Sequence, residues 1–228
     1  MWVIAHRGGG DLFPENTLSA FRQSEALGVD MVECDVHVSR DGQLMVIHDP
    51  TLSRTGGQDL RVSNLTADEL SRIDVGHGEG VPTLTVLLEA ISIPVVVEIK
   101  TPDAVRGLLG LLGSNPSLAS RIVPISFYHR AVKELVDRVP GLEAGVLLAG
   151  VPVDLAHVAR QAHVRMLSLH YEMVNQQLVE EMHQEECLVT VWTPNSREDI
   201  ALMVAAGVDG IASDRPDWAL EARRMAHG

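Results

Sequence analysis

The sequence predicts an α/β fold, a closed (β/α)8 barrel of the TIM type with a small hairpin and cap insertion after the second strand. Eight short runs rich in β-branched apolar residues alternate with stretches of helical character, which is typical of parallel βα units. Three runs in the first fifty residues end in ionisable side chains, as strands do at the mouth of a barrel. An open doubly wound sheet is the alternative, but eight repeats favour closure.

Strands and helices alternate along the whole chain. The expected strands are Trp2–His6, Met31–Val36, Val95–Lys100, Ile122–Phe127, Glu143–Leu148, Met166–His170, Leu188–Thr193 and Gly210–Asp214. The expected helices are Thr17–Leu27, Val86–Ala90, Asp103–Leu112, Arg130–Val139, Asp154–Ala162, Asn175–Glu185, Ser196–Ala206 and Trp218–Met225. Asn16 is a candidate N-cap, and Gly28 and Gly207 stand where a helix end favours a left-handed residue. We therefore expect one catalytic barrel domain, residues 1–228.

The interval 39–82 contains no helix of ordinary length. Asp41-Gly42 is typical of a tight two-residue turn, and 44–47 then forms a returning strand in which Ile47 faces Val36. This hairpin brings His48 back beside Asp35. Residues 49–82 are polar and rich in glycine, with one short helix near 67–73, so we expect a small cap over the mouth.

The composition narrows the class of partner. The chain has 31 acidic and 18 basic side chains, for a net charge of −13, which argues against binding nucleic acid or anionic membranes. A small anionic substrate is compatible with this net negative charge if local cations and a metal make the electrostatic potential positive in one pocket. Cys34 and Cys187 lie in separate apolar runs and are expected to be buried free thiols. A strand begins at Trp2, leaving no room for a signal peptide, and no apolar run is long enough to cross a membrane, so the expected location is cytoplasmic.

Three carboxylates predict a metal site. Glu33 and Asp35 are two residues apart on one expected strand, so both point to one side. Glu98 and Lys100 repeat this spacing on the next barrel strand. Three carboxylates meeting inside a barrel would repel one another unless a hard divalent cation bound them, and oxygen ligands favour Mg²⁺ or Ca²⁺. The alternative is that Glu98 and Lys100 form an ordinary ion pair.

Two histidines and two cations complete the candidate site. His6 ends the first strand, and the glycines after Arg7 suit a close approach of the backbone to a ligand. Arg7 and Lys100 can bind an oxyanion, while His6 and His48 can act as base and acid. No role is expected for the histidines in polar helical segments, which are His129, His157, His163, His183 and His227, and His170 is the best decoy. Trp192 ends the seventh strand, either as an apolar wall of the site or as a core side chain.

A short internal sequence similarity, which we call the echo, links the second and last strands. Gly28 to Asp35 and Gly207 to Asp214 both contain a helix stop, a loop, a strand and a terminal aspartate. Shared loop chemistry is the simpler explanation. The echo places Asp214 at the height of Asp35, with Ala212 in the position of Glu33.

Taken together, these segments resemble the glycerophosphodiester phosphodiesterases. The resemblance is carried by His6-Arg7-Gly8, Pro14-Glu15-Asn16-Thr17, Glu33-Cys34-Asp35-Val36, Asp41-Gly42, His48-Asp49-Pro50-Thr51-Leu52, Pro82-Thr83-Leu84, Glu98-Ile99-Lys100, Ser126-Phe127, Trp192-Thr193 and Ser213-Asp214-Arg215-Pro216. It implies a TIM-type barrel that hydrolyses glycerophosphodiesters to glycerol 3-phosphate and an alcohol. It implies one divalent cation, Mg²⁺ or Ca²⁺, and a small-molecule substrate. The acidic net charge and the lack of a long apolar run predict no nucleic-acid partner and no stable membrane insertion.

The resemblance also assigns roles to single residues. It implies that Glu33, Asp35 and Glu98 are metal ligands and that His6 and His48 are the acid–base pair. The resemblance also implies that the substrate is bound by Arg7, Lys100, Trp192 and Glu15. Which histidine is the base, whether water or the glycerol 2-hydroxyl attacks, which alcohol is preferred and what oligomer forms are left open.

Two other functions compete with this interpretation. A lysophospholipase D-like enzyme of the same architecture would need an apolar surface beside the mouth, whereas the expected cap is polar. A catalytically silent barrel that only binds phosphate ligands would be expected to lose a histidine or a metal ligand. In this sequence both histidines and all three carboxylates are present.

Overall fold

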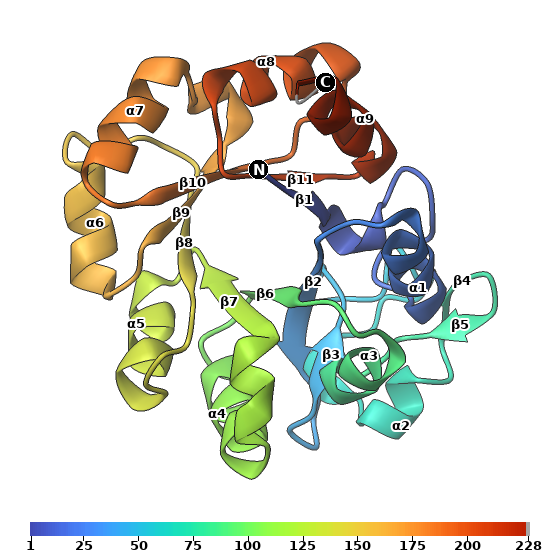
Figure 1. Ribbon diagram of the computed structural model, residues 1–228. Coiled ribbons are helices and arrows are strands. Elements are labelled where there is room, and N and C mark those ends of the chain that lie inside the picture. The colour runs from blue at the N-terminus through green and yellow to red at the C-terminus, as the bar shows by residue number, and fades with distance from the viewer. Residues whose placement is uncertain (227–228) are drawn as a thin grey trace.

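A closed parallel barrel confirms the predicted fold class. The computed structural model describes residues 1–226. The sheet has the order β1-β11-β10-β9-β8-β7-β6-β2-β3, and an additional pairing of β1 with β2 closes the ring of eight parallel strands (Figure 1). The barrel strands are β1 (Trp2–Ala5), β2 (Met31–Val38), β6 (Val95–Ile99), β7 (Ile122–Ser126), β8 (Gly145–Leu148), β9 (Met166–His170), β10 (Leu188–Trp192) and β11 (Gly210–Ser213).

Several strands end one residue before the expected side chain. His6, Lys100 and Asp214 therefore lie just beyond the strands, where the backbone is free to turn toward the mouth. His6 begins a short 3₁₀ turn, η1 (His6–Gly8).

Helices surround the barrel on its outer side (Figure 1). They are α1 (Leu18–Leu27), α3 (Leu84–Ala90), α4 (Ala104–Ser114), α5 (His129–Arg138), α6 (Leu155–Ala162), α7 (Gln176–Gln184), α8 (Arg197–Ala206) and α9 (Pro216–Ala226). Gly28 and Gly207 end α1 and α8 with φ of 86° and 80°, as expected. The expected N-cap of α1 is wrong by one residue. The Thr17 hydroxyl accepts from Ala20 N, which leaves the Asn16 side chain free for another partner.

Alternation along the strands creates two apolar layers. One face of each strand packs against the helices, as Val3, Val97 and Val189 do. The other face fills the barrel interior, with Ile4 and Leu147 as examples. Because both faces are covered, the strands are apolar along most of their length, and the ionisable groups collect at their ends.

The hairpin after β2 has a register different from the expected one. In the antiparallel pair of β2 with β3 (Leu44–Val46), Val36 faces Val46, whereas a two-residue turn would have placed it opposite Ile47. A shift of one residue exchanges the faces of a strand. His48 nevertheless reaches the mouth because the chain continues beyond the end of β3.

The turn of this hairpin explains the difference. Ser39 N donates to Gln43 O, so three residues, 40–42, lie in the turn. Gly42 has a φ of 83°, and the Ser39 hydroxyl accepts from Gln43 N while it donates to Asp41. A three-residue loop that ends in a left-handed glycine is a common hairpin form, and Asp41-Gly42 alone does not distinguish it from the two-residue form.

The segment 49–82 contains short elements around a small apolar cluster. They are η2 (Val62–Asn64), α2 (Ala67–Leu70), β4 (Asp74–Gly76) and β5 (Glu79–Gly80). Met45 and Ile47 from the hairpin pack against Leu52, Leu70 and Val81. In Figure 1 the segment lies beside β3 and α3.

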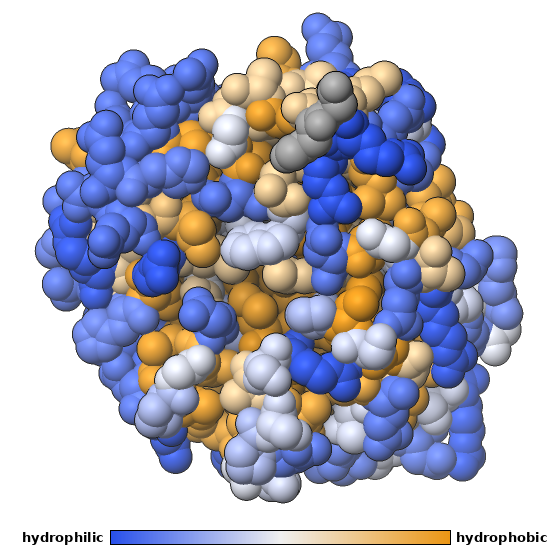
Figure 2. Space-filling view, in the orientation of Figure 1, coloured by the Kyte–Doolittle hydropathy of each residue, from blue (hydrophilic) through white to orange (hydrophobic). Residues whose placement is uncertain are grey.

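The N-terminus and the end of α9 lie at the end of the barrel where the strands begin (Figure 1). Figure 2 shows this face, with apolar residues near its centre and hydrophilic residues around them. The catalytic candidates therefore lie at the opposite end, where the strands finish. Among residues 1–226, no helix has the length and apolar character that crossing a membrane requires.

Candidate active site

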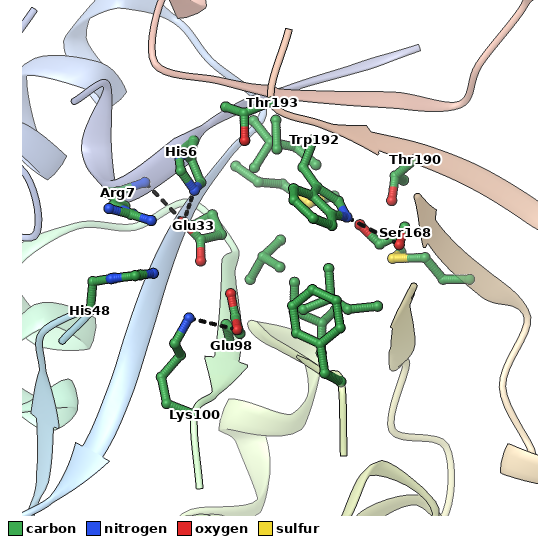
Figure 3. A pocket seen from close by; sticks show the side chains of 18 residues that line it. His6, Arg7, Glu33, His48, Glu98, Lys100, Ser168, Thr190, Trp192 and Thr193 are labelled. Atoms are coloured by element: carbon green, nitrogen blue, oxygen red, sulfur yellow. Dashed lines mark hydrogen bonds and ion pairs between the residues drawn. The ribbon is translucent and has the colours of Figure 1, made fainter. Parts of the chain in front are cut away.

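A cavity of about 170 Å³ opens at the carboxyl ends of the strands. Seven of the predicted site residues line it, namely His6, Arg7, Glu33, His48, Glu98, Lys100 and Trp192. Figure 3 shows the charged side chains on one side and Trp192, Ser168 and Thr190 on the other. We call these sides the charged half, formed by residues along β2 and β6 and after β1, β3, β6 and β11, and the apolar half, formed by residues along β7 to β11 and after β7 to β10. Asp35 and Glu15 do not line the cavity but contact residues that do.

Three carboxylates lie together in the charged half. One oxygen each of Glu33, Asp35 and Glu98 lies within 4.8 Å of the others. Glu33 and Asp35 are buried, and within residues 1–226 no hydrogen bond reaches Glu33 Oε1 or Asp35 Oδ1. Buried carboxylate oxygens without a donor are costly unless a cation binds them. The donor set is oxygen only, and it therefore suits a hard divalent ion.

The three carboxyl groups differ in their affinity for a proton. Burial and the charge of Asp35 raise the pKa of Glu33 to about 8. Burial and Asp35 also raise the pKa of Glu98. Burial alone would raise the pKa of Asp35, but the charges of Lys100 and Arg7 outweigh it and lower that pKa below its usual value.

Two cations flank the carboxylates. Lys100 Nζ lies 2.8 Å from Glu98 Oε1 and 3.3 Å from Asp35 Oδ1. Arg7 Nε lies 3.4 Å from Asp35 Oδ2, and Arg7 N donates to Glu33 Oε2 at 2.9 Å. Arg7 has a φ of 51°, a left-handed conformation that directs its backbone N–H and its side chain to the same group of acids.

His6 is oriented by a residue from the last strand. Asp214 Oδ1 lies 2.7 Å from His6 Nδ1, and Asn195 donates to the other oxygen of Asp214 at 2.6 Å. His6 Nε2 lies 3.9 Å from Glu33 Oε2. Burial lowers the pKa of His6, but the hydrogen bond to Asp214 and the charge of Glu33 outweigh it, so the pKa is raised. The echo indicated that Asp214 lies at the mouth but not that it contacts His6.

The glycines after Arg7 approach protein rather than open space. A Cβ on Gly10 would lie 2.9 Å from Asp214 Oδ1, and one on Gly8 would lie 3.0 Å from Ala20 Cβ. Their small size therefore brings the first loop against α1 and against the carboxylate that holds His6.

His48 has a carboxylate partner of its own. Asp49 Oδ1 lies 2.7 Å from His48 Nδ1. Arg54 donates to Asp49 through Nε and to both oxygens of Glu15 through Nη1 and Nη2, each at 2.7 Å. Glu15 Oε1 also lies 3.4 Å from Arg7 Nη1. One side chain of the insertion thus links the loops that carry the two histidines.

Asn16 and His37 support the site from behind. Asn16 Nδ2 donates to Asp35 Oδ2 at 2.9 Å, which explains why this residue does not cap α1. His37 does not line the cavity, and its Nε2 lies 3.0 Å from the carbonyl oxygen of His48.

The apolar half has an aromatic wall. Trp192 donates from Nε1 to Ser168 O at 3.2 Å, so its indole is fixed against β9. Phe127 packs edge to face on Trp192 with ring centroids 5.6 Å apart, and His170 does so at 5.0 Å. His170 does not line the cavity. The other predicted bystanders, His129, His157, His163 and His183, lie outside the cavity lining, and His227 lies outside the described residues.

Known proteins share both the sequence and this architecture. The model of the glycerophosphoryl diester phosphodiesterase family matches residues 6–218. A glycerophosphodiester phosphodiesterase of Caldanaerobacter subterraneus subsp. tengcongensis is 33% identical over 230 residues, covering 94% of each chain. A solved glycerophosphodiester phosphodiesterase from Parabacteroides distasonis has a TM-score of 0.83 at 26% identity, covering 99% of this chain and 96% of that one.

A further solved structure shares the fold. It is an Oleispira antarctica phosphodiesterase in complex with the product sn-glycerol-3-phosphate. The TM-score is 0.90 at 24% identity, covering 98% of this chain and 97% of that one.

Proposed function

The chain belongs to the glycerophosphoryl diester phosphodiesterase family and has its activity, and we propose that it releases glycerol 3-phosphate by two-histidine acid–base catalysis beside a bound divalent cation. The observation that carries the proposal is the pairing of His6 with Asp214 and of His48 with Asp49, next to three clustered carboxylates.

The two histidines are arranged alike for proton transfer. In each, Nδ1 faces a carboxylate at 2.7 Å, which leaves Nε2 as the nitrogen available to the cavity (Figure 3). A carboxylate on Nδ1 fixes the ring and the tautomer. One imidazole then takes the proton of the attacking hydroxyl, and the other protonates the alcohol that leaves.

Glu33, Asp35 and Glu98 would hold the divalent cation. Bound there, it would neutralise charge on the phosphoryl oxygens. The fit is supported by the close carboxylates and by the buried Glu33 Oε1, which has no hydrogen-bond partner among residues 1–226.

Arg7 and Lys100 would bind the phosphate from the same side. Both already contact the carboxylates, so their charges are held at the cavity rather than in solvent. Trp192 would cover the glycerol carbons from the opposite side. Glu15 lies behind Arg7 and would act through that side chain and through Arg54.

Glycerophosphocholine hydrolysis with added Mg²⁺ or Ca²⁺ tests the proposal, with glycerol 3-phosphate as the readout. His6→Ala and His48→Ala should each lower kcat by about a hundredfold to ten-thousandfold. Calorimetry should show that cation binding is retained. His157→Ala, an exposed histidine of α6, is the matched control. Near-full activity of either site variant would contradict the acid–base assignment.

Hydrolysis of lysophospholipids, a lysophospholipase D-like activity, is a second candidate. One observation favours it, because large apolar side chains are exposed on the loops that follow β7, β8 and β9, beside the apolar half. The polar character of segment 49–82 argues against this activity, but the exposed apolar side chains lie on another part of the mouth.

A further inference from the structure

Two buried hydroxyl groups line the cavity beneath its aromatic wall, and we call them the hydroxyl pair. Ser168 is 5% exposed and Thr190 is 3% exposed, and both line the cavity. They are paired in register between the parallel strands β9 and β10, so they lie side by side and face the same interior. Each lies two residues before the end of its strand, about 7 Å deeper along the barrel than Trp192 or His170. Figure 3 shows both on the far side of Trp192 from the charged residues.

The hydroxyl pair has no partner in the protein. Within residues 1–226 no hydrogen bond reaches Ser168 Oγ or Thr190 Oγ1, although the carbonyl oxygen of Ser168 accepts from Trp192. The methyl group of Thr190 lies beside Gly210, where an added Cβ would be 3.1 Å from it. Buried hydroxyls are ordinarily satisfied by protein, water or ligand, because leaving them without a partner is costly. Both groups are therefore available to a polar group that enters the cavity.

The wall around the hydroxyl pair is apolar. The other residues of β7, β8, β9 and β11 that line the cavity are Ile125, Leu147, Met166 and Ala212. Such a wall offers no counter-charge to an ionic group. Two adjacent hydroxyls can bind one further hydroxyl, which donates to one of them and accepts from the other. The ligand group that fits is therefore an uncharged hydroxyl on a short carbon chain.

We propose that Ser168 and Thr190 bind the terminal hydroxyl of the substrate glycerol and so select glycerophosphodiesters over diesters of other short alcohols, an inference that rests on the proposed function. With the phosphate beside Arg7 and Lys100 and the glycerol carbons against Trp192, the hydroxyl on C1 is the glycerol group furthest from phosphorus. It extends past the indole to the hydroxyl pair, whereas the C2 hydroxyl stays nearer to the phosphate. A site built to bond a hydroxyl rejects an analogue that lacks it, because its own buried polar groups then lose their partner.

A substrate without the terminal hydroxyl tests this selection. Hydrolysis of glycerophosphocholine would be compared, by choline release, with that of 2-hydroxypropyl phosphocholine of the same configuration at C2. This deoxy substrate lacks only the C1 hydroxyl, so water and the C2 hydroxyl both remain available as nucleophiles. The wild-type kcat/KM should be about ten- to a hundredfold lower for the deoxy substrate, because two buried hydrogen bonds are lost. Equal kcat/KM values for the two substrates would overturn the proposal.

Paired variants test which residues make the selection. Thr190→Val keeps the shape of the side chain but removes its hydroxyl, whereas Thr190→Ser keeps the hydroxyl and removes the methyl group. Thr190→Val, and likewise Ser168→Ala, should lower kcat/KM for glycerophosphocholine by about three- to tenfold and for the deoxy substrate by less than about twofold. Thr190→Ser is the matched control and should keep the wild-type preference between the substrates. Equal losses on both substrates would indicate a purely structural role and would contradict the proposal.

Product binding distinguishes failure of the hydroxyl pair from failure of the proposed function. Calorimetric titration of glycerol 3-phosphate and of 2-hydroxypropyl phosphate, with Mg²⁺ present, measures the selection without turnover. Glycerol 3-phosphate should bind about tenfold more tightly, and the double variant Ser168→Ala with Thr190→Val should lose this difference. That result supports the hydroxyl pair even if no diester is hydrolysed. Hydrolysis of glycerophosphocholine without the difference in affinity rejects the hydroxyl pair alone, and the absence of both hydrolysis and binding rejects both proposals.

Discussion

The charged half and the apolar half of the mouth are built in different ways. In the charged half, side chains far apart in sequence hold one another through hydrogen bonds and ion pairs, as Asp214 holds His6 and Arg54 connects Asp49 with Glu15. In the apolar half, the Trp192 indole has one hydrogen bond and packs against the rings of Phe127 and His170. Reaction chemistry needs fixed charges at fixed distances, whereas holding an organic group depends mostly on shape and apolar area. The two halves should therefore respond differently to substitution.

The largest effect should come from a carboxylate of the charged half. Glu33→Gln should lower kcat by about a thousandfold because a cation ligand is lost. The same change should stabilise the metal-free protein by about 1–2 kcal/mol at pH 7, because the Glu33 carboxyl, whose pKa is raised to about 8, must take up a proton on folding at that pH, whereas glutamine need not. Activity on glycerophosphocholine and thermal unfolding with a chelator check both parts. A Glu33→Gln variant that keeps a tenth or more of the wild-type activity would contradict the expected difference between the two halves.

The next largest effect should come from substituting the carboxylates that orient the histidines. Asp214→Asn and Asp49→Asn keep the size of the side chain but no longer fix the tautomer of the ring. Each should lower kcat by about ten- to a hundredfold with little change in KM. In a His6→Ala background, Asp214→Asn should have no further effect, because the partner is already absent. Additive losses would show that Asp214 acts elsewhere.

A substitution in the apolar half should change KM more than kcat, whereas the substitutions in the charged half should change kcat more than KM. Trp192→Phe removes contact area and the hydrogen bond to Ser168 but leaves the charged half intact. KM for glycerophosphocholine should rise by about three- to tenfold, with kcat within about twofold of the wild type. Steady-state kinetics with saturating cation measure this. A fall in kcat comparable to that of Asp214→Asn would mean that the halves are not separate.

A smaller effect should come from the insertion. Arg54→Gln breaks the connection between Asp49 and Glu15, but Arg54 is about half exposed, so its ion pairs are screened by water. We expect a two- to fivefold loss of kcat, about the effect of a partly exposed ion pair. Arg72→Gln, an exposed arginine of the same segment that pairs with Asp68, should have no effect. Equal effects of the two variants would assign the loss to folding of the segment.

The smallest effect belongs to neither half. Hydrogen bonds from the side chain and backbone of Ser92 lower the pKa of Glu25, at the end of the barrel opposite the mouth. Its contribution to stability is therefore present above the unfolded pKa of about 4.3 and is lost as pH falls through the lower folded pKa. Glu25→Gln should lower the Tm by about 1–3 °C at pH 7, and the difference should shrink as the pH falls below about 4.3. Activity should not change.

Much of the charged half could be predicted because parallel strands end together. Glu33, Glu98 and Lys100 lie in or directly after short β-branched runs that favour strands, and closing the barrel brings these residues to one cavity. The hairpin brings His48 to the site, as predicted, although the predicted register of its strands was wrong by one residue. The turn chemistry of Asp41-Gly42 is shared by loops of two and three residues, so the sequence alone does not distinguish them.

The apolar half and the links between loops could not be predicted in the same way. Phe127, Val151 and Val153 lie in loops, where no periodicity separates an exposed apolar side chain from a buried one. The bond between Asp214 and His6 joins the first strand to the last, and it depends on closure of the ring. Asn16 has the residue type of an N-cap, and only the structure shows that its side chain bonds Asp35 instead.

A crystal structure with Ca²⁺ and glycerol 3-phosphate would test the division of the mouth most directly. The account predicts the cation between Glu33, Asp35 and Glu98, the phosphate beside His6 and His48, and the glycerol carbons against Trp192. A cation bound elsewhere, or glycerol carbons turned toward Arg7 and Lys100, would contradict it.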